Sequence, residues 1–277
     1  MRPGPVSSLR RPVVLRSVLH RALHEHRRSV LAWSSSLFTL VVMVAAVFPT
    51  IRGNQQIVKL YDNYPKALRS LFGITDLTTG PGYMNAEIFS LMAPLLVIVF
   101  AVLWGGDLIS GEEERGTMDI LLANPISRRR LLIEKWAALA AGSTMAGAAL
   151  AAGLAFASPI FGLGISVEGA AAAVVSVVLL GLLYGTVALA VGATTGHRGL
   201  ARGATTGLAV AAYLISSLAG LVGWLKPVRP LSPWYHALGT DPLTHGFVGV
   251  HLLVLPLLTA ALLIGSVYFF DRRDLAV

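Results

Sequence analysis

Three consecutive carboxylates, Glu112, Glu113 and Glu114, are the residues in this sequence whose types and spacing best suit chemistry. They lie within residues 108–135, the longest stretch after residue 86 that a bilayer could not hold. Each carboxylate would cost several kcal/mol in hydrocarbon. Long apolar runs flank this stretch on both sides. We therefore expect a polar elbow, residues 108–135, that stays in water between two membrane-spanning helices.

The catalytic and nucleotide-binding motifs that this sequence approaches each lack a required residue. Residues 111–118, GEEERGTM, have the glycine spacing of a phosphate-binding loop, but Thr117 and Met118 stand where Lys and a hydroxyl residue are needed, and three carboxylates would repel phosphate. The H-E-x-x-H zinc motif does not occur, and Ser166 in GISVEG misses the G-x-S-x-G nucleophile motif by one residue. We predict no catalytic residue and no cofactor in this chain.

A metal site is not predicted either. His20 and His24 are four residues apart and could share a metal, but no third ligand is evident nearby, so we interpret them as solvated side chains on a basic surface helix.

The elbow itself has the features of a docking element. Thr117 can cap a short helix that ends at Pro125. The apolar face of that helix would carry Met118, Ile120, Leu121 and Leu122. Glu112 and Glu114 would offer negative charge to a basic partner surface, while Arg128–Arg130 would anchor at lipid headgroups. An ordinary polar loop is the alternative, and the residues alone leave both interpretations open.

Composition places the elbow in a membrane protein. The chain has 277 residues, of which 55% are hydrophobic and 13% charged, with a mean hydropathy of +0.70. Soluble domains carry about a quarter charged residues. The chain has 0 Cys, which excludes disulfides and thiolate metal sites. The net charge of +8 fits membrane topology and contact with anionic lipid, and we predict no nucleic-acid binding.

Hydrophobic patterning predicts an all-α, polytopic fold with a single transmembrane domain over residues 1–277. Six runs are long enough to span a bilayer, at roughly residues 30–50, 87–107, 136–158, 170–195, 203–225 and 248–270. The N-terminal arm, residues 1–29, contains an amphipathic helix suited to the cytoplasmic interface, and a second amphipathic pattern over residues 57–72 suits the outer surface. The proline-rich segment before the last span suits the interface or a short re-entrant hairpin.

Lys and Arg set the orientation. Of the 22 Lys and Arg residues, sixteen fall in the arm, the elbow, the loop between the fourth and fifth spans, and the tail, whereas six fall in the three opposite loops. This bias places both termini and the elbow in the cytoplasm.

Small residues at four-residue spacing predict close packing of helices. The pairs are Gly181 and Gly185, Gly192 and Gly196, and the series Gly199, Gly203 and Gly207. Such spacing brings helix backbones together in lipid. The sequence leaves open whether the packing is within the chain or between copies.

The elbow resembles the signature of bacterial ATP-binding-cassette export permeases of the type-2 class. The matching pattern, E-x-E-x-G-T-x-x-x-L-L-x-x-P-x-S-R, is carried by Glu112, Glu114, Gly116, Thr117, Leu121, Leu122, Pro125, Ser127 and Arg128. The interfacial N-terminal helix, six spans, large first outer loop and LSPWY-like segment extend the resemblance over most of the chain. The sequence departs from the family at Glu134, where a glycine usually precedes the lysine that matches Lys135.

The resemblance implies a membrane subunit that is not an enzyme. The elbow would contact a separate nucleotide-binding subunit, which would hold ATP and Mg, and two permease copies, identical or different, would work together in the bacterial cytoplasmic membrane. The cargo class would be a lipophilic drug, antibiotic or lipid-like molecule, with ions and polysaccharide left open. The first, second and fifth spans would line the route, so we choose Gly207 and Ala211 as pathway residues. An intramembrane lipid-modifying enzyme and a non-transporting scaffold are the alternatives.

Overall fold

The computed structural model describes residues 18–54, 56, 63–74, 76–118 and 126–273, and within these ranges it is helical and contains no strand. The long helices are α1 (Val18–Gly53), α5 (Met92–Gly105), α8 (Arg128–Phe161), α9 (Val167–Thr195), α10 (Arg198–Leu218) and α13 (Gly249–Arg272). The short helices are α3 (Lys66–Leu71), α4 (Gly80–Met84), the π-helix η1 (Asn85–Phe89), α6 (Ser110–Glu114), the 3-10 helix η2 (Gly223–Leu231), α11 (Pro233–Leu238) and α12 (Pro242–His245). The predicted all-α class is confirmed.

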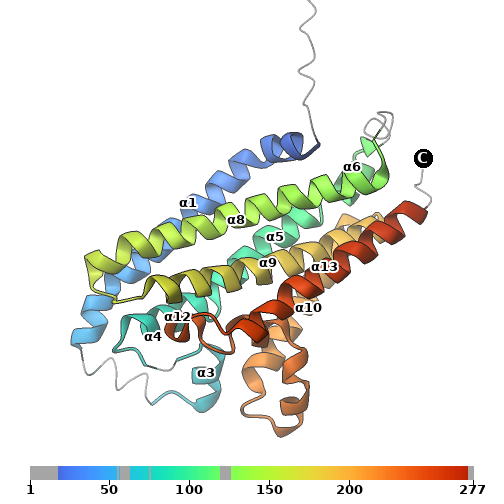
Figure 1. The fold of residues 1–277 in the computed structure, drawn as a ribbon. Coiled ribbons are helices and arrows are strands. Elements are labelled where there is room, and N and C mark those ends of the chain that lie inside the picture. The colour runs from blue at the N-terminus through green and yellow to red at the C-terminus, as the bar shows by residue number, and fades with distance from the viewer. Residues whose placement is uncertain (1–17, 55, 57–62, 75, 119–125, 274–277) are drawn as a thin grey trace, which may run out of the picture.

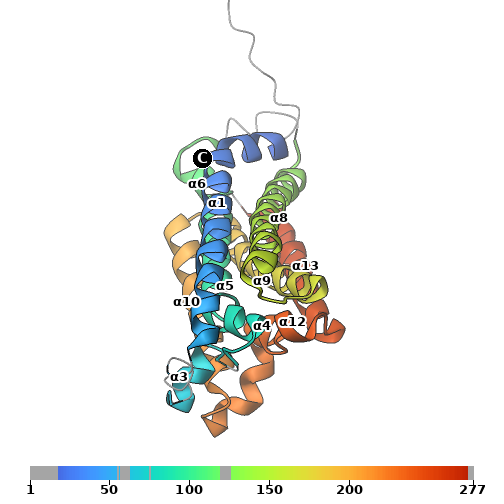
Figure 2. The ribbon, with the colours of Figure 1, turned by 90° about the vertical axis from the view of Figure 1, so that its left-hand side faces the viewer.

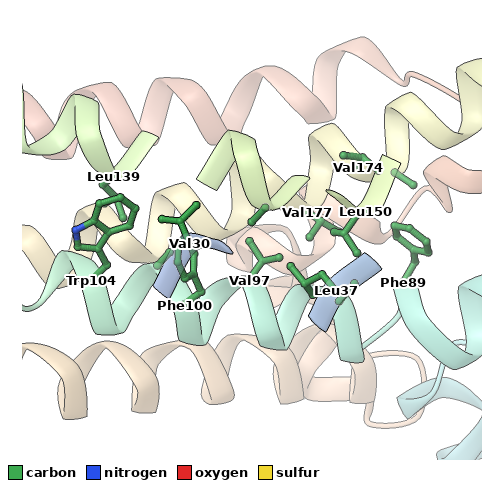
Figure 3. Close-up of a cluster of buried hydrophobic side chains, with 14 of the residues drawn as sticks. Val30, Leu37, Phe89, Val97, Phe100, Trp104, Leu139, Leu150, Val174 and Val177 are labelled. Carbon is green, nitrogen blue, oxygen red and sulfur yellow. The ribbon is translucent and has the colours of Figure 1, made fainter. Parts of the chain in front are cut away.

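Helix α9 lies in the middle of the bundle, between α5, α8, α10 and α13 (Figure 1). Its apolar side chains pack with those of α1, α5 and α8 in one continuous core, in which Val97 of α5 lies toward Val177 and Leu150, and Phe100 of α5 lies beside Val30 (Figure 3). Helices α1 and α13 expose most of their apolar surface instead. A helix that is apolar on all sides yet only partly covered by protein is suited to lipid.

Close packing within the chain explains part of the glycine pattern. A Cβ on Gly105 of α5 would lie 2.2 Å from the carbonyl oxygen of Gly185, and one on Gly181 would lie 2.6 Å from Val97. The backbones of α5 and α9 can therefore approach each other only with glycine at these positions. A Cβ on Gly199, Gly203 or Gly207 of α10 would meet no atom of the described residues within 4 Å outside its own helix, so this row is open in the described part of the chain.

Helix α1 joins the predicted interfacial helix and the predicted first span into one continuous helix of 36 residues. Figure 2 shows its first turns lying across the end of the bundle before the helix turns to run along α8. The backbone N–H of Leu19 donates to Glu134 Oε2 of α8 at 3.2 Å, and Glu134 Oε1 accepts from Arg130 at 2.7 Å. Glu134, the departure from the family pattern, thus satisfies a free N–H at the start of α1.

Five helical segments are long and apolar enough to cross a membrane in the described part of the chain: Val18–Gly53, Gly80–Gly105, Arg128–Phe161, Val167–Thr195 and Gly249–Arg272. They correspond to the first four predicted spans and the sixth. The predicted fifth span, residues 203–225, differs, because α10 begins at Arg198 and ends at Leu218, before the 3-10 helix η2. The six-span topology therefore stays a prediction.

The short helices α3, α4, η2, α11 and α12 gather at the end of the bundle opposite α6 (Figure 1). The proline-rich segment forms η2, α11 and α12, with prolines at the first position of α11 and α12, where a missing backbone N–H costs nothing. Of the amphipathic pattern predicted over residues 57–72, only the last part can be placed, as α3, because residues 57–62 lie outside the described ranges.

Candidate functional site

The elbow begins with α6, a helix of five residues that carries all three carboxylates. It ends in a Schellman motif: the N–H of Thr117 donates to the carbonyl of Glu112 at 3.0 Å, and the N–H of Gly116 donates to that of Glu113 at 3.0 Å. Gly116 has a φ of +66°, which side chains with a Cβ rarely adopt. The Gly-Thr pair of the sequence signature therefore ends α6.

Each of the three carboxylates bonds to a different long helix or its end. Successive residues of a helix point about 100° apart, so three neighbours cannot share one face. Glu112 pairs with α8, Glu113 with the end of α13, and Glu114 with the start of α10. We call this arrangement the carboxylate hub, formed by Glu112, Glu113 and Glu114.

Glu112 is buried and pairs with a buried lysine. Its carboxylate lies 2.9 Å from Lys135 Nζ, which also donates to the Leu108 carbonyl at 2.5 Å. Thr117 Oγ1 donates to the other carboxylate oxygen. Burial alone would raise the pKa of Glu112, but the charge of Lys135 and the Thr117 hydrogen bond outweigh it and hold this pKa below its ordinary value. Glu112 is 6% exposed, contrary to the expectation that it offers its charge to a partner.

Glu113 holds the C-terminal end of α13. Arg273 donates to both of its carboxylate oxygens, at 3.1 and 2.9 Å, and to the Ala193 carbonyl of α9 at 3.0 Å. Arg128 donates to the Arg273 carbonyl at 2.6 Å, and Arg129 donates twice to Asp271, at 3.0 and 2.9 Å. The start of α8, the end of α13 and α6 are therefore joined by charge-assisted bonds.

Glu114 and Asp107 hold the start of α10. The N–H of Arg198 donates to Glu114 Oε1 at 2.9 Å, and its side chain lies 3.2 Å from Glu114 Oε2 and 3.1 Å from Asp107. A carboxylate at a helix N-terminus is favoured by the helix dipole. Burial would raise the pKa of Asp107, but its bond to Arg198 and the charge of Arg115 outweigh this and lower that pKa.

The remaining predicted elbow residues are placed only in part. Leu121, Leu122 and Pro125 lie outside the described residues, as does most of the short helix expected after Thr117. Ser127 caps α8 by accepting from the N–H of Arg130 at 3.3 Å. Arg128 donates to the carbonyl of Arg273 at the end of α13, which is a role other than the predicted lipid anchor.

An apolar cavity of about 710 Å³ lies between α9, α10, α13 and the segment formed by η2 and α11. Ala211, one of the two predicted pathway residues, lines it together with Tyr184, Ile215 and Leu258. Gly207 does not line it and has open space around its Cα. The first and second predicted spans contribute no lining residue among the described side chains. The lining comes from α9, α10, α13 and the segment formed by η2 and α11.

Two features of this site were not predicted from the sequence. The pairing of Glu113 with Arg273 joins residues 160 positions apart, and the available sequence signal was a third acidic residue between the two that fit the motif. The pairing of Glu112 with Lys135 was not predicted either, although both residues belong to the family pattern. In the described part of the chain no three His, Asp or Glu side chains gather as metal ligands, and His20 and His24 form no such group.

Comparison with protein families gives one match. Residues 17–275 match the model of a family described as ABC-2 family transporter protein. A comparison with curated proteins gives no match. The match covers nearly the whole chain, including the elbow, the five apolar helices and the C-terminal end of α13 that the hub holds. The chain therefore belongs to the ABC-2 transporter family, as a multi-pass membrane permease subunit of the type-2 class.

Proposed function

We propose that this chain is the membrane subunit of an exporter driven by ATP that a separate subunit binds and hydrolyses with Mg. Permeases of this family generally work with an ATP-binding subunit. The observation that carries the proposal is the carboxylate hub: one short helix outside the membrane is tied by charge to α8, α10 and α13. A push on α6 would therefore move three membrane helices together.

The surface offered to the ATPase subunit is the exposed end of the elbow rather than Glu112. Arg115 and Gly116 follow α6 at the surface, and Glu114 is 38% exposed at its side chain. Residues 117–128 of the family signature continue from there. We propose that this end docks on the partner and that Glu112, Glu113 and Glu114 transmit the movement inward.

We propose six spans with both termini in the cytoplasm of a bacterial cell. Helix α10 has 21 residues, about 31 Å at 1.5 Å per residue, which is enough to cross the hydrocarbon core. Counting α10 as a span makes the number even. An even number agrees with the Lys and Arg bias, which places the arm, elbow and tail on the same side.

We propose a lipophilic small molecule, such as a drug, an antibiotic or a lipid-like compound, as cargo. The apolar cavity is lined by aliphatic and aromatic side chains from α9, α10 and α13, with few polar groups. A site of this size and chemistry selects by shape and apolar surface. The family favours transport over the two alternatives, an intramembrane lipid enzyme and a scaffold.

We propose a second permease copy, identical or different, against the open face of α10. Gly199, Gly203 and Gly207 leave this face without a Cβ, and a Cβ built there would meet no other described segment within 4 Å. Small residues at this spacing allow a second helix to approach closely in lipid. The route would then run beside α10, where the cavity lies.

The test uses this permease co-expressed with an ATPase subunit encoded by a neighbouring gene. The two should co-purify, and a lipophilic fluorescent dye should stimulate ATP hydrolysis in proteoliposomes and move across the bilayer. Hydrolysis that no dye, antibiotic or lipid stimulates, together with no movement of any of them, would contradict the exporter proposal.

A further inference from the structure

A second cavity, the outer polar pocket, lies at the end of the bundle opposite α6. It has a volume of about 250 Å³, and its walls come from α3, η1, α10, η2 and the turn after α11. Its polar lining includes Ser70, Asn85, Tyr213, Ser217, Arg229 and Asp241. Five segments far apart in the sequence therefore place hydroxyl, amide, cationic and anionic groups around one small space.

Arg229 brings an unsatisfied positive group to this pocket. Its Nε is buried and has no hydrogen-bond partner in the described part of the chain. The guanidinium carbon lies 4.8 Å from the centre of the Tyr235 ring, which fixes the side chain without using any of its N–H groups. A buried donor of a charged group without an acceptor is costly, and native structures rarely leave one.

Asp241 brings an unsatisfied negative group to the same pocket. It stands at the N-cap position of α12, but its side chain makes no capping bond, whereas Ser127 and Ser166 both cap their helices in the ordinary way. Its Oδ1 is buried without a hydrogen-bond partner among the described residues. Asp241 is also the described non-glycine residue with a positive φ, +49°.

Arg229 and Asp241 line one cavity, and one buried atom of each, Nε and Oδ1, has no hydrogen-bond partner among the described residues. No ion pair joins Arg229 to Asp241 in the described chain, although both line the pocket. Leaving both unpaired disfavours the empty protein, and a ligand with one charge would satisfy only one of them. A ligand with both charges would satisfy each. A volume of about 250 Å³ holds roughly eight water-sized groups, which suits a small ligand.

We infer that the outer polar pocket binds a small zwitterion, with its anionic group on Arg229 and its primary ammonium group on Asp241. The guanidinium donates N–H bonds to carboxylate or phosphate oxygens, and the carboxylate accepts from the ammonium. The same chemistry occurs in a free amino-phosphate and in the headgroup of an aminophospholipid. This inference goes beyond the proposed transport function, because binding here requires neither the ATPase subunit nor the apolar cavity.

The first experiment measures binding by the purified permease alone. O-phosphoethanolamine is titrated in detergent free of aminophospholipid, beside ethanolamine and inorganic phosphate, which carry charge of one sign only. In nanodiscs, lipid retention is compared between phosphatidylethanolamine and phosphatidylcholine. Tighter binding of O-phosphoethanolamine than of either fragment assigns a free ligand, and selective retention of phosphatidylethanolamine assigns the headgroup. If neither occurs, or phosphate alone binds equally well, the inference is wrong.

The second experiment separates a binding role from a structural one. Arg229→Gln and Asp241→Asn each remove one charge with little change in shape, and asparagine tolerates the positive φ. Each should weaken binding about tenfold or more, the effect of a bond to a charged group. Each should also leave the melting temperature of the ligand-free permease unchanged or raised, because an unpaired charge is removed. Lys226→Gln, an exposed cation on the same η2 helix, is the control and should change neither quantity.

Two results would overturn the assignment at this step. One is a lower melting temperature of the ligand-free permease in both variants, which would show that the charges are structural. The other is wild-type binding by both variants, which would place the ligand elsewhere.

Discussion

Glu112 is the least exposed of the hub carboxylates because Lys135 reaches it from α8 and Thr117 covers its other oxygen. Glu113 is intermediate and Glu114 the most exposed, with side-chain exposures of 16% and 38%. The carboxylates of this one motif therefore have different roles. The buried pair fixes the geometry of α6, whereas the outer carboxylate lies at the surface that a partner would approach.

The pKa of Glu112 gives a prediction about acid. Its pKa in the folded chain lies below the ordinary carboxyl value of about 4.3, so its pairing contributes full stability above that value and loses it as pH falls through the lower folded pKa. Hydrogen-exchange protection factors of residues 110–117 should therefore stay constant from neutral pH down to the ordinary carboxyl range and fall only below it. Loss of protection centred between about pH 5 and 7 would contradict this.

Glu112→Gln should remove the acid-dependent loss of hydrogen-exchange protection. It should also lower the stability of the elbow at neutral pH. Removing one partner leaves Lys135 buried and unpaired, which costs about 3 kcal/mol. Glu25→Gln breaks an exposed pair, with Arg21, and should cost at most about 1 kcal/mol. Thermal unfolding of the purified permease compares the two. Equal shifts in melting temperature would show that burial of the Glu112 pair has no energetic consequence.

At the scale of elements, the end of α6 depends on Gly116. Gly116→Ala places a Cβ at φ +66° and should destabilise the elbow by about 1 to 2 kcal/mol, while Gly116→Asn should cost less. Gly265→Ala, in open space on helix α13, should be neutral or stabilising. Hydrogen exchange of α6 and co-purification of the ATPase subunit measure the effect. If Gly116→Ala behaves like Gly265→Ala in both assays, the Schellman motif does not position the elbow.

The next prediction concerns helix α10 and the proposed cargo route beside it. Ala211→Phe would fill part of the apolar cavity and should lower dye transport several-fold without changing insertion or assembly. Ala260→Phe is the matched control, since Ala260 is exposed on α13 and does not line the cavity. Transport rates in proteoliposomes distinguish the two. Equal rates in both variants would place the cargo route outside this cavity.

Much of the order of the helices can be predicted from local sequence. The candidate site can be predicted only in part. Apolar runs of sufficient length predict the long helices, because helix length and hydropathy are local properties. The continuity of α1 from the interfacial helix into the first span and the end of α10 at Leu218 were not predicted, and both helices lie against other elements there, α1 along α8 and α10 beside η2. The motif predicted the importance of Glu112 and Glu114 but not their partners. Pairing of Glu113 with Arg273 depends on how α13 packs against α9, which no local pattern contains.

At the scale of the whole molecule, the orientation can be tested by cysteine labelling, and the absence of native Cys keeps the background low. Thr78→Cys and Lys226→Cys lie at the end opposite α6 and should react with an impermeant thiol reagent in intact cells. His197→Cys and Arg130→Cys lie at the elbow end and should react only after lysis. The reverse pattern would overturn the orientation.

The central claim is that the carboxylate hub transmits movement between the ATPase subunit and the membrane helices. The most direct test is cargo-stimulated ATP hydrolysis by the reconstituted complex with Glu113→Arg, Arg273→Glu and the double variant. Each single variant places two like charges at 2.9 Å and should assemble with the ATPase but lose most of the cargo stimulation. The double variant restores the opposite charges and should recover much of it, while Arg21→Glu at an exposed pair should change little. Full stimulation in both single variants would contradict the claim.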